Sequence, residues 1–176
     1  MTGPGSLDWQ NPTDFLVADP VARALAAWPT SAAVLAAPID ADLADTAAFC
    51  EHYGVAPEDS ANCVVIAGRR GESVSYAACV VLATTRADVN GTVRRRLGAK
   101  KASFAAMEDA IVLTGMEYGG ITPIGLPDGW PVLVDRAVLD REVVVIGSGL
   151  RRSKIAVAPV VLAELPGAEV IDGLAS

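Results

Sequence analysis

Glycine and proline are concentrated in one short segment of the chain, residues 113–126, between a helical pattern and a strand pattern. The residues concerned are Gly115, Gly119, Gly120, Pro123 and Gly125. Glycine reaches positive φ and lets the backbone approach a ligand, while proline holds a turn without donating a hydrogen bond. Such a loop can bind a small polar group through its main-chain N–H and C=O groups. A tight turn with a purely structural role explains the same residues equally well.

Cysteine and histidine are scarce in this chain. Cys50, Cys63 and Cys79 are widely spaced, and His52 is the only histidine. A zinc site needs about four such ligands, so we expect no metal, no other cofactor and no disulfide framework. The thiols are expected to be buried in a reducing cytoplasm. His52 lies in an amphipathic helical pattern, which does not favour a catalytic triad.

Charge is distributed unevenly along the chain, although the net charge is −7. Residues 1–60 hold nine acidic residues and one basic residue, whereas residues 61–176 hold twelve acidic and thirteen basic residues. The basic residues of the second part form two groups, Arg94, Arg95, Arg96, Lys100 and Lys101, and then Arg151, Arg152 and Lys154. These groups could contact a phosphate backbone, or they could simply form solvated faces.

The composition is that of one globular domain. The chain has 176 residues, 52% of them hydrophobic, and a mean hydropathy of +0.38. No apolar run approaches the roughly 18 residues that span a bilayer, and the N-terminus does not have the pattern of a secretory signal. We therefore expect a cytoplasmic protein with no membrane partner. Residues 1–18 are expected to be a partly disordered extension, followed by a single domain over residues 19–176.

Helical and strand patterns alternate irregularly along the chain. Helices are predicted at 20–28 with Asp19 as cap, at 42–53, from either Asp88 or Asn90 to residue 97 with Gly98 as the stop, at 107–114 and at 159–165. Strands are predicted at 31–37, 62–67, 74–83, 101–104, 132–135, 142–147, 155–157 and 168–171. The pair 62–67 and 74–83 is predicted to form a hairpin with its turn near Gly71. This order indicates an α+β fold with a mixed sheet.

Four segments in this order carry a resemblance to a known family. They are Leu97-Gly98-Ala99-Lys100-Lys101, then Thr114-Gly115 with Gly119-Gly120-Ile121-Thr122-Pro123-Ile124-Gly125, then Val132-Leu133-Val134-Asp135, and then Val145-Ile146-Gly147-Ser148-Gly149. Together they resemble the aminoacyl-tRNA editing domains of the YbaK/prolyl-tRNA synthetase-associated family, over about residues 30–172.

The resemblance implies a single compact α+β domain with a mixed, mostly antiparallel curved sheet flanked by helices. It also implies a free-standing, trans-acting deacylase that hydrolyses the ester of a tRNA mischarged with a small amino acid. The partners would be the mischarged tRNA and an aminoacyl-tRNA synthetase. An aminoacyl ester is already activated, so a positioned water and a few donors to the oxyanion can suffice.

Site residues follow from the same resemblance. Gly119, Gly120 and Pro123 would present main chain to the substrate, with Thr122 as a donor or a turn cap. Gly147 and Gly149 would form the facing wall, with the Ser148 hydroxyl available for hydrogen bonding.

Asp135 would lie at the base of the pocket, where it could accept from the substrate ammonium, hold a loop N–H or merely cap its strand. Lys100, Lys101, Arg151 and Arg152 would approach the phosphates of the acceptor stem, or serve only solubility.

One departure from the family pattern concerns the pocket itself. Many members carry a lysine at the start of the hairpin strand, where this chain has Asn62. Asparagine donates and accepts hydrogen bonds but supplies no charge. The sequence therefore leaves three alternatives open: a deacylase with a different arrangement, a catalytically degenerate module that only binds tRNA or a synthetase, and a binder of a free small molecule.

Overall fold

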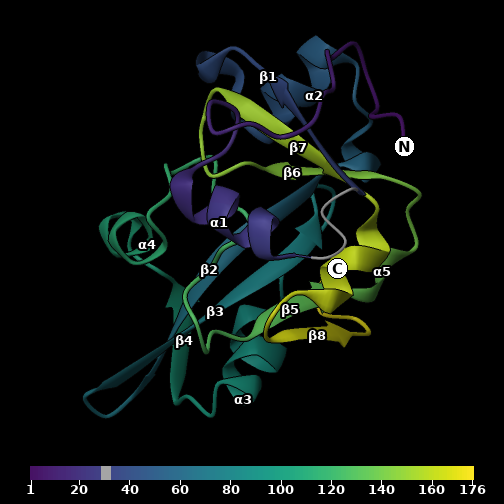
Figure 1. Ribbon diagram of the computed structural model, residues 1–176. Coiled ribbons are helices and arrows are strands. Elements are labelled where there is room, and N and C mark those ends of the chain that lie inside the picture. Colours follow the sequence, from purple (N-terminus) through teal and green to yellow (C-terminus); the bar gives the residue numbers. More distant parts are fainter. Residues whose placement is uncertain (29–32) are drawn as a thin grey trace.

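The computed structural model describes residues 1–28 and 33–176, which form two β-sheets with helices around them (Figure 1). The larger sheet has the strand order β4-β2-β3-β5-β8 and the smaller one β1-β7-β6. The strands are β1 Val34–Pro38, β2 Ala61–Arg70, β3 Ser73–Leu82, β4 Lys101–Phe104, β5 Val132–Asp135, β6 Val144–Gly147, β7 Ser153–Val157 and β8 Ala168–Ile171. The α-helices are α1 Asp19–Ala27, α2 Thr46–Tyr53, α3 Arg94–Arg96, α4 Met107–Thr114 and α5 Arg136–Leu139.

The larger sheet is built on the predicted hairpin. Strands β2 and β3 pair antiparallel from Ala61↔Leu82 to Arg70↔Ser73, and Gly71 turns the chain at a φ of 62°. Antiparallel β4 extends the sheet on one side, and parallel β5 and β8 extend it on the other. The fold is thus the predicted α+β domain with mixed, mostly antiparallel pairing.

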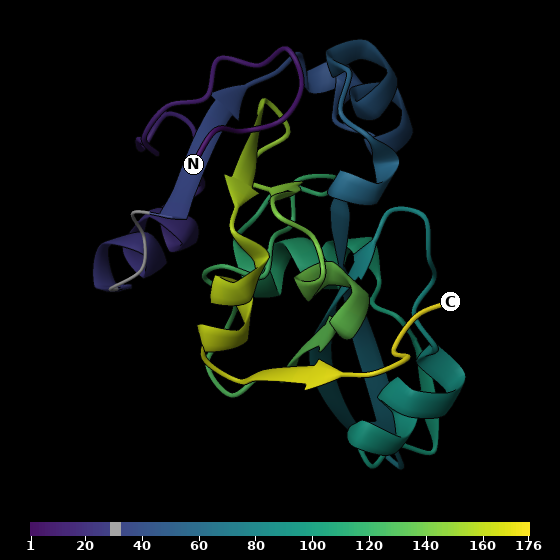
Figure 2. The same ribbon diagram turned by 90° about the vertical axis from the view of Figure 1, so that its right-hand side faces the viewer.

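The smaller sheet meets the larger one where β6 approaches the start of β2. Ser60 and Val145 form a parallel bridge at this point. The N-terminal segment runs alongside β1, as Figure 2 shows, and Gln10 pairs with Ala36 there. The fold therefore brings the start of the hairpin strand β2 next to strand β6 of the smaller sheet.

Several predicted boundaries need correction. Asp19 was expected to cap α1, but it lies in the first turn, and Ala18 occupies the cap position. The predicted helix 42–53 is split into a 3₁₀ turn, Ala41–Leu43, and α2, whose cap is Asp45. The Asp45 carboxylate interrupts the helix because it accepts hydrogen bonds from the first free N–H groups of α2.

Three other segments also differ from expectation. The predicted strand 31–37 begins at Val34, and its residues 31 and 32 lie outside the described part of the chain. The segment 88–97 begins as a π-helix, Val89–Val93, and only then becomes α3. Segment 159–165 forms a 3₁₀ helix, Pro159–Glu164, and the short helix α5 follows β5 without having been predicted.

The core is made largely of small aliphatic side chains. Its fully buried members include Val21, Val80, Val134, Ile146 and Ile155, which draw on both sheets and α1. Within the described residues, no helix is long and apolar enough to cross a membrane, and no group of three or more His, Cys, Asp or Glu residues could hold a metal ion.

Candidate active site

A pocket of about 390 Å³ opens where the two sheets meet. The start of α2, strand β2, the loop after β4, the glycine-rich loop, and strands β6 and β7 all contribute to its wall. The polar and glycine residues that line it are Asp45, Thr46, Ser60, Asn62, Cys63, Tyr118, Gly119, Gly147, Arg151 and Lys154. Its volume lies at the low end of the roughly 300–1,000 Å³ typical of small-molecule sites.

The two glycine turns lie against each other at this pocket. The Gly149 N–H donates to the Gly120 carbonyl at 2.7 Å, and the Glu117 N–H donates to the Gly149 carbonyl at 2.9 Å. A Cβ at Gly147 would overlap the Gly120 carbonyl, so only glycine allows this approach. Gly119 and Gly147 therefore present bare main chain to the pocket, whereas Gly120 and Gly149 do not line it.

Arg151 closes one side of the pocket from the second glycine turn. Its guanidinium donates to the Ala41 carbonyl at 3.0 Å and to the Tyr118 carbonyl at 3.3 Å. Its main-chain N–H also donates to the Glu117 carboxylate at 2.6 Å. These contacts hold the guanidinium beside Gly119, whose φ is 88°.

Asn62 lies half-buried on β2 and lines the pocket. Its Oδ1 accepts a hydrogen bond from the Thr46 hydroxyl at 2.8 Å. Because this contact assigns the oxygen to Thr46, the Asn62 amide keeps its two N–H donors for other partners. Thr46 follows Asp45, the cap of α2, so the helix start positions the Asn62 side chain.

Lys154 on β7 brings a cation to the same pocket. Only 7% of this residue is exposed, and its Nζ donates to the Ala44 carbonyl at 2.9 Å. The ammonium also lies 5.1 Å from the centroid of the Phe49 ring. Burial lowers the pKa of Lys154 from 10.5 to about 8; Cys50 and Asp45 raise it and Arg151 lowers it to smaller extents.

Cys63 is the one thiol that lines the pocket among the described residues, but it is unsuited to act as a nucleophile. Burial, and to a lesser extent the neighbouring Cys79, raise the pKa of the Cys63 thiol well above its ordinary value. The nucleophile is the thiolate, which such an environment suppresses. The site thus offers hydrogen-bond donors and positive charge, but no reactive thiol among the described residues that line it.

Comparison with known sequences identifies the family. The aminoacyl-tRNA editing domain matches residues 40–165, which is most of the chain. The chain belongs to the aminoacyl-tRNA editing domain family. The matched region includes every residue that lines the pocket.

Solved structures agree with this editing-domain fold. A crystal structure described as a candidate trans-editing enzyme for prolyl-tRNA synthetase superposes with a TM-score of 0.70 at 23% identity, covering 88% of this chain and 96% of the other. A scaffold protein for computational epitope grafting superposes with a TM-score of 0.74 at 23% identity, covering 88% of this chain and 95% of the other. At this identity the likeness concerns the fold.

Three residues expected in the editing pocket lie behind it. Ser148 is fully buried, and its hydroxyl contacts Ser153 Oγ at 2.7 Å instead of facing the cavity. Thr122 is also fully buried, and its hydroxyl has no hydrogen-bond partner among the residues that the structure describes. Pro123 lines a separate hollow beside Trp130. These residues shape the two turns from within the core.

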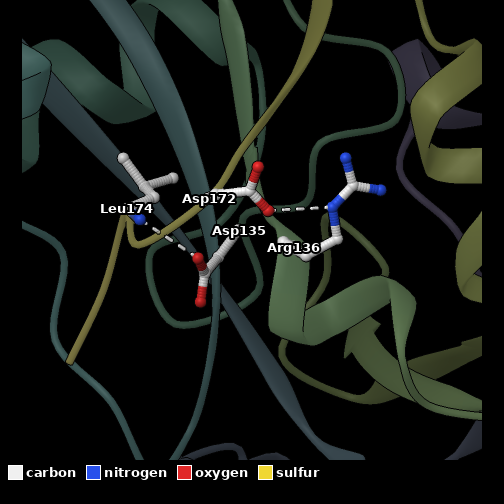
Figure 3. Close-up of polar contacts among 4 residues, drawn as sticks. All are labelled: Asp135, Arg136, Asp172 and Leu174. Carbon is white, nitrogen blue, oxygen red and sulfur yellow. Dashed lines mark hydrogen bonds and ion pairs between the residues drawn. The ribbon is translucent and has the colours of Figure 1, made fainter.

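Asp135, expected at the pocket base, is not among the residues that line the pocket. It ends β5, and its carboxylate accepts a hydrogen bond from the Leu174 N–H at 3.1 Å (Figure 3). Burial raises the pKa of Asp135, whereas hydrogen bonds from main-chain N–H groups lower it. The neighbouring ion pair of Arg136 with Asp172, at 3.1 Å, belongs to the same C-terminal contact. Asp135 therefore anchors the C-terminal segment to the sheet.

The basic residues proposed to approach tRNA lie in different settings. Lys100 and Lys101 are exposed at the start of β4, where Lys101 pairs with Arg69 of β2. Arg152 instead donates to the Phe15 carbonyl at 3.1 Å and stacks over the Phe15 ring. Of the predicted residues, the structure thus brings Asn62, Gly119, Gly147 and Arg151 together at the pocket.

Sequence reasoning missed Lys154, Thr46 and Asp45 as pocket residues of this editing domain. Lys154 follows Arg151 and Arg152, so the sequence groups it with a basic cluster. The available signal was its position directly before the apolar run 155–157, because the strand Ser153–Val157 that contains both is buried throughout. Thr46 and Asp45 gave no signal beyond that of an ordinary helix start.

Proposed function

We propose that this protein is a trans-acting deacylase that hydrolyses the ester bond of a tRNA mischarged with a small amino acid. The observation that carries the proposal is the glycine-walled pocket, where bare main chain, Asn62 and Lys154 face one space of about 390 Å³. Family membership supports the same reaction class. The tRNA, and a synthetase that releases it, are the proposed partners.

The reaction needs one water molecule and no covalent intermediate. The water oxygen bonds to the ester carbonyl carbon, and the carbonyl electron pair moves onto its oxygen. The oxyanion then collapses, the bond to the ribose oxygen breaks, and that oxygen takes up a proton while the attacking water releases one. The products are a free amino acid and a tRNA with a free 3′ end. Donors aimed at the oxyanion supply the main stabilisation.

The substrate enters with its terminal ribose at the rim. Phe104 and Tyr118 line the pocket and expose 65% and 53% of their surface, so their rings are available to stack on the terminal adenine. The aminoacyl group occupies the interior, which the side chains of Phe49 and Ile146 narrow. A small interior excludes larger, correctly attached amino acids, as editing requires.

The test is a deacylation panel with the full-length protein. tRNAs charged with alanine, glycine, serine or cysteine are incubated with it, and loss of labelled amino acid is measured against spontaneous ester decay. We expect acceleration for at least one small amino acid and none for a tRNA charged with a large one. If no ester decays faster than in buffer, the deacylase proposal fails. Tight tRNA binding without turnover would then favour the binding module, for which the uncharged Asn62 argues.

A further inference from the structure

Lys154 is a buried cation whose hydrogen bond and ring contact within residues 1–28 and 33–176 are with neutral groups, while the Asp45 carboxylate acts on it without forming an ion pair and to a smaller extent than burial. Its hydrogen bond goes to a neutral carbonyl, that of Ala44, and its other contact is the face of the Phe49 ring. None of the ion pairs found within residues 1–28 and 33–176 includes it. Burying an ammonium without an anionic partner is costly.

A purely structural role does not explain this cost. A methionine would fill a similar volume on β7 without the loss of hydration. Lys154 also lines the pocket instead of lying inside the core, so its remaining N–H donors can reach a ligand there. An electron-rich oxygen of the ligand would complete the contacts of the ammonium.

We infer that Lys154 donates to the carbonyl oxygen of the scissile ester and stabilises the oxyanion that forms when water adds to it. This inference rests on the proposed deacylase function. Lys154 keeps its own proton throughout, because the proton that the ribose oxygen gains is balanced by the one that the attacking water loses. The attraction between the Lys154 ammonium and the carbonyl oxygen is strongest once water has attacked, because only then does that oxygen carry a full negative charge. Lys154 therefore stabilises the transition state more than the bound substrate, which lowers the barrier.

The surrounding charges also fix the orientation of the substrate. The α-ammonium group of an aminoacyl ester is repelled by Lys154 and by the nearby Arg151. Asp45 lines the same pocket and carries the opposite charge. The substrate therefore binds with its ammonium toward Asp45 and its carbonyl oxygen toward Lys154.

Lys154 and Asn62 come from different strands, β7 and β2, and line one pocket. The pocket thus has a cation although its hairpin strand supplies none. If the charge is what matters, a lysine placed at position 62 can replace the one at position 154. If Lys154 had only a structural role, a lysine at position 62 would not restore the activity lost on its removal.

The test compares steady-state deacylation by wild type, Lys154→Met, the double variant Lys154→Met/Asn62→Lys, and Arg23→Met as a control for removing an exposed cation from α1. For Lys154→Met we expect kcat to fall about 10²- to 10³-fold, the size of effect seen on removing an oxyanion donor, with KM changed only a few-fold. The double variant should regain at least about tenfold in kcat. Arg23→Met should match wild type.

Two results overturn the inference while leaving the deacylase function intact: a kcat for Lys154→Met within threefold of wild type, or a double variant no faster than the single one. Thermal unfolding shows whether each variant is folded. If Lys154→Met does not fold, Lys154→Gln replaces it, since glutamine keeps a donor without the charge.

A separate arm covers the case in which wild type hydrolyses nothing. Calorimetry then measures binding of 3′-(L-alanylamino)-3′-deoxyadenosine, whose amide replaces the ester. Affinity that falls a few-fold in Lys154→Met, in line with the few-fold change expected in KM, would keep Lys154 as the carbonyl-binding residue although hydrolysis is absent. Equal affinity in both proteins, or no binding to wild type, would overturn the inference along with the function.

Discussion

The Gly149 N–H donates to the Gly120 carbonyl at 2.7 Å and so ties the glycine-rich loop to the turn between β6 and β7. Gly147 allows this contact because a side chain there would overlap the Gly120 carbonyl. The two turns are more than 25 residues apart in sequence, yet they form one wall of the pocket. The glycines of these turns allow the two turns to contact each other, and Gly119 and Gly147 also line the pocket.

The first prediction concerns Gly120→Ala. The added methyl group would lie 2.5 Å from the Leu150 carbonyl oxygen, which is main chain and cannot move aside easily. We expect a loss of about 1–3 kcal/mol in the free energy of unfolding, measured by denaturant titration. Gly54→Ala is the control, because no atom lies within 4 Å of its added methyl and only its φ of 68° is unfavourable. A Gly120→Ala protein as stable as wild type, but inactive, would assign Gly120 to substrate binding instead.

The second prediction concerns Asp135. Asp135→Ala leaves the buried Leu174 N–H without its acceptor, which costs about 1–3 kcal/mol of stability. Asp135→Asn keeps an acceptor and should lie closer to wild type. Denaturant titration measures both, and the deacylation rate per folded molecule should be unchanged. A deacylation rate that falls sharply in a fully folded Asp135→Asn protein would show that this carboxylate takes part in the reaction.

Burial raises the pKa of Asp135, so this group has a defined effect on stability with pH. The folded state retains the proton to a higher pH than the unfolded state, and stability is lost as pH rises above 3.8 through the folded pKa. Asp135→Asn removes this pH-dependent contribution to the free energy of unfolding, because asparagine does not titrate. Its stability relative to wild type should therefore increase as the pH rises from about 3 to neutrality.

Local patterns predicted most of the elements but not the site. The β2–β3 hairpin, β4, α4 and β5 lie where alternation, helical period and glycine stops placed them. Helix α4 nevertheless turns Ala110 and Thr114 inward and leaves Met107 52% exposed. Which face of so short a helix is buried depends on its neighbours, which the period does not specify.

The site could be predicted only where it is local in sequence. The glycine-rich loop stands out from its own segment, whereas the second glycine turn and Asn62 are found only through the family resemblance. Lys154 lines the pocket because β7 pairs with both β1 and β6. Ser148 does not line it, because its hydroxyl is hydrogen-bonded to Ser153 Oγ. Both outcomes follow from pairing between distant segments, about which spacing along the chain carries little information.

The third prediction concerns Asp45. It rests on the proposed orientation of the substrate, with the ammonium group toward this carboxylate. Asp45→Asn keeps a good cap for α2, since asparagine caps helices about as well as aspartate, but removes the charge. We expect KM for the mischarged tRNA to rise about three- to tenfold, with kcat nearly unchanged, because the ammonium contact is present in both ground and transition states. An unchanged KM would show that the ammonium binds elsewhere.

The fourth prediction concerns Lys100 and Lys101 at the exposed start of β4. If they contact tRNA phosphates, changing both to glutamate should weaken binding and flatten its dependence on salt. Each lost contact reduces the slope of log K against log salt by about 0.7–0.9. Filter binding at several salt concentrations measures it. Arg23→Met on α1 serves as the control, and an unchanged slope in the Lys100 and Lys101 variant would place the tRNA surface elsewhere.

The fifth prediction concerns the stability that Lys154 costs. Its pKa falls from 10.5 in the unfolded chain to about 8 in the folded one, with burial as the main cause. Below pH 8 both states are protonated and the burial cost is fully present. Between about pH 8 and 10.5 the folded state has released a proton that the unfolded state still holds, so wild-type stability rises with pH.

Lys154→Met lacks this titration. Its stability relative to wild type should therefore decline as pH rises from 7 to 10.5, by up to about 3 kcal/mol, since each unit of pKa corresponds to about 1.4 kcal/mol. Urea titrations at several pH values measure the difference, and Arg23→Met should run parallel to wild type. The comparison is independent of any substrate. A difference that stays constant across this range would mean that the ammonium reaches solvent, and the electrostatic role assigned to Lys154 would lose its physical basis.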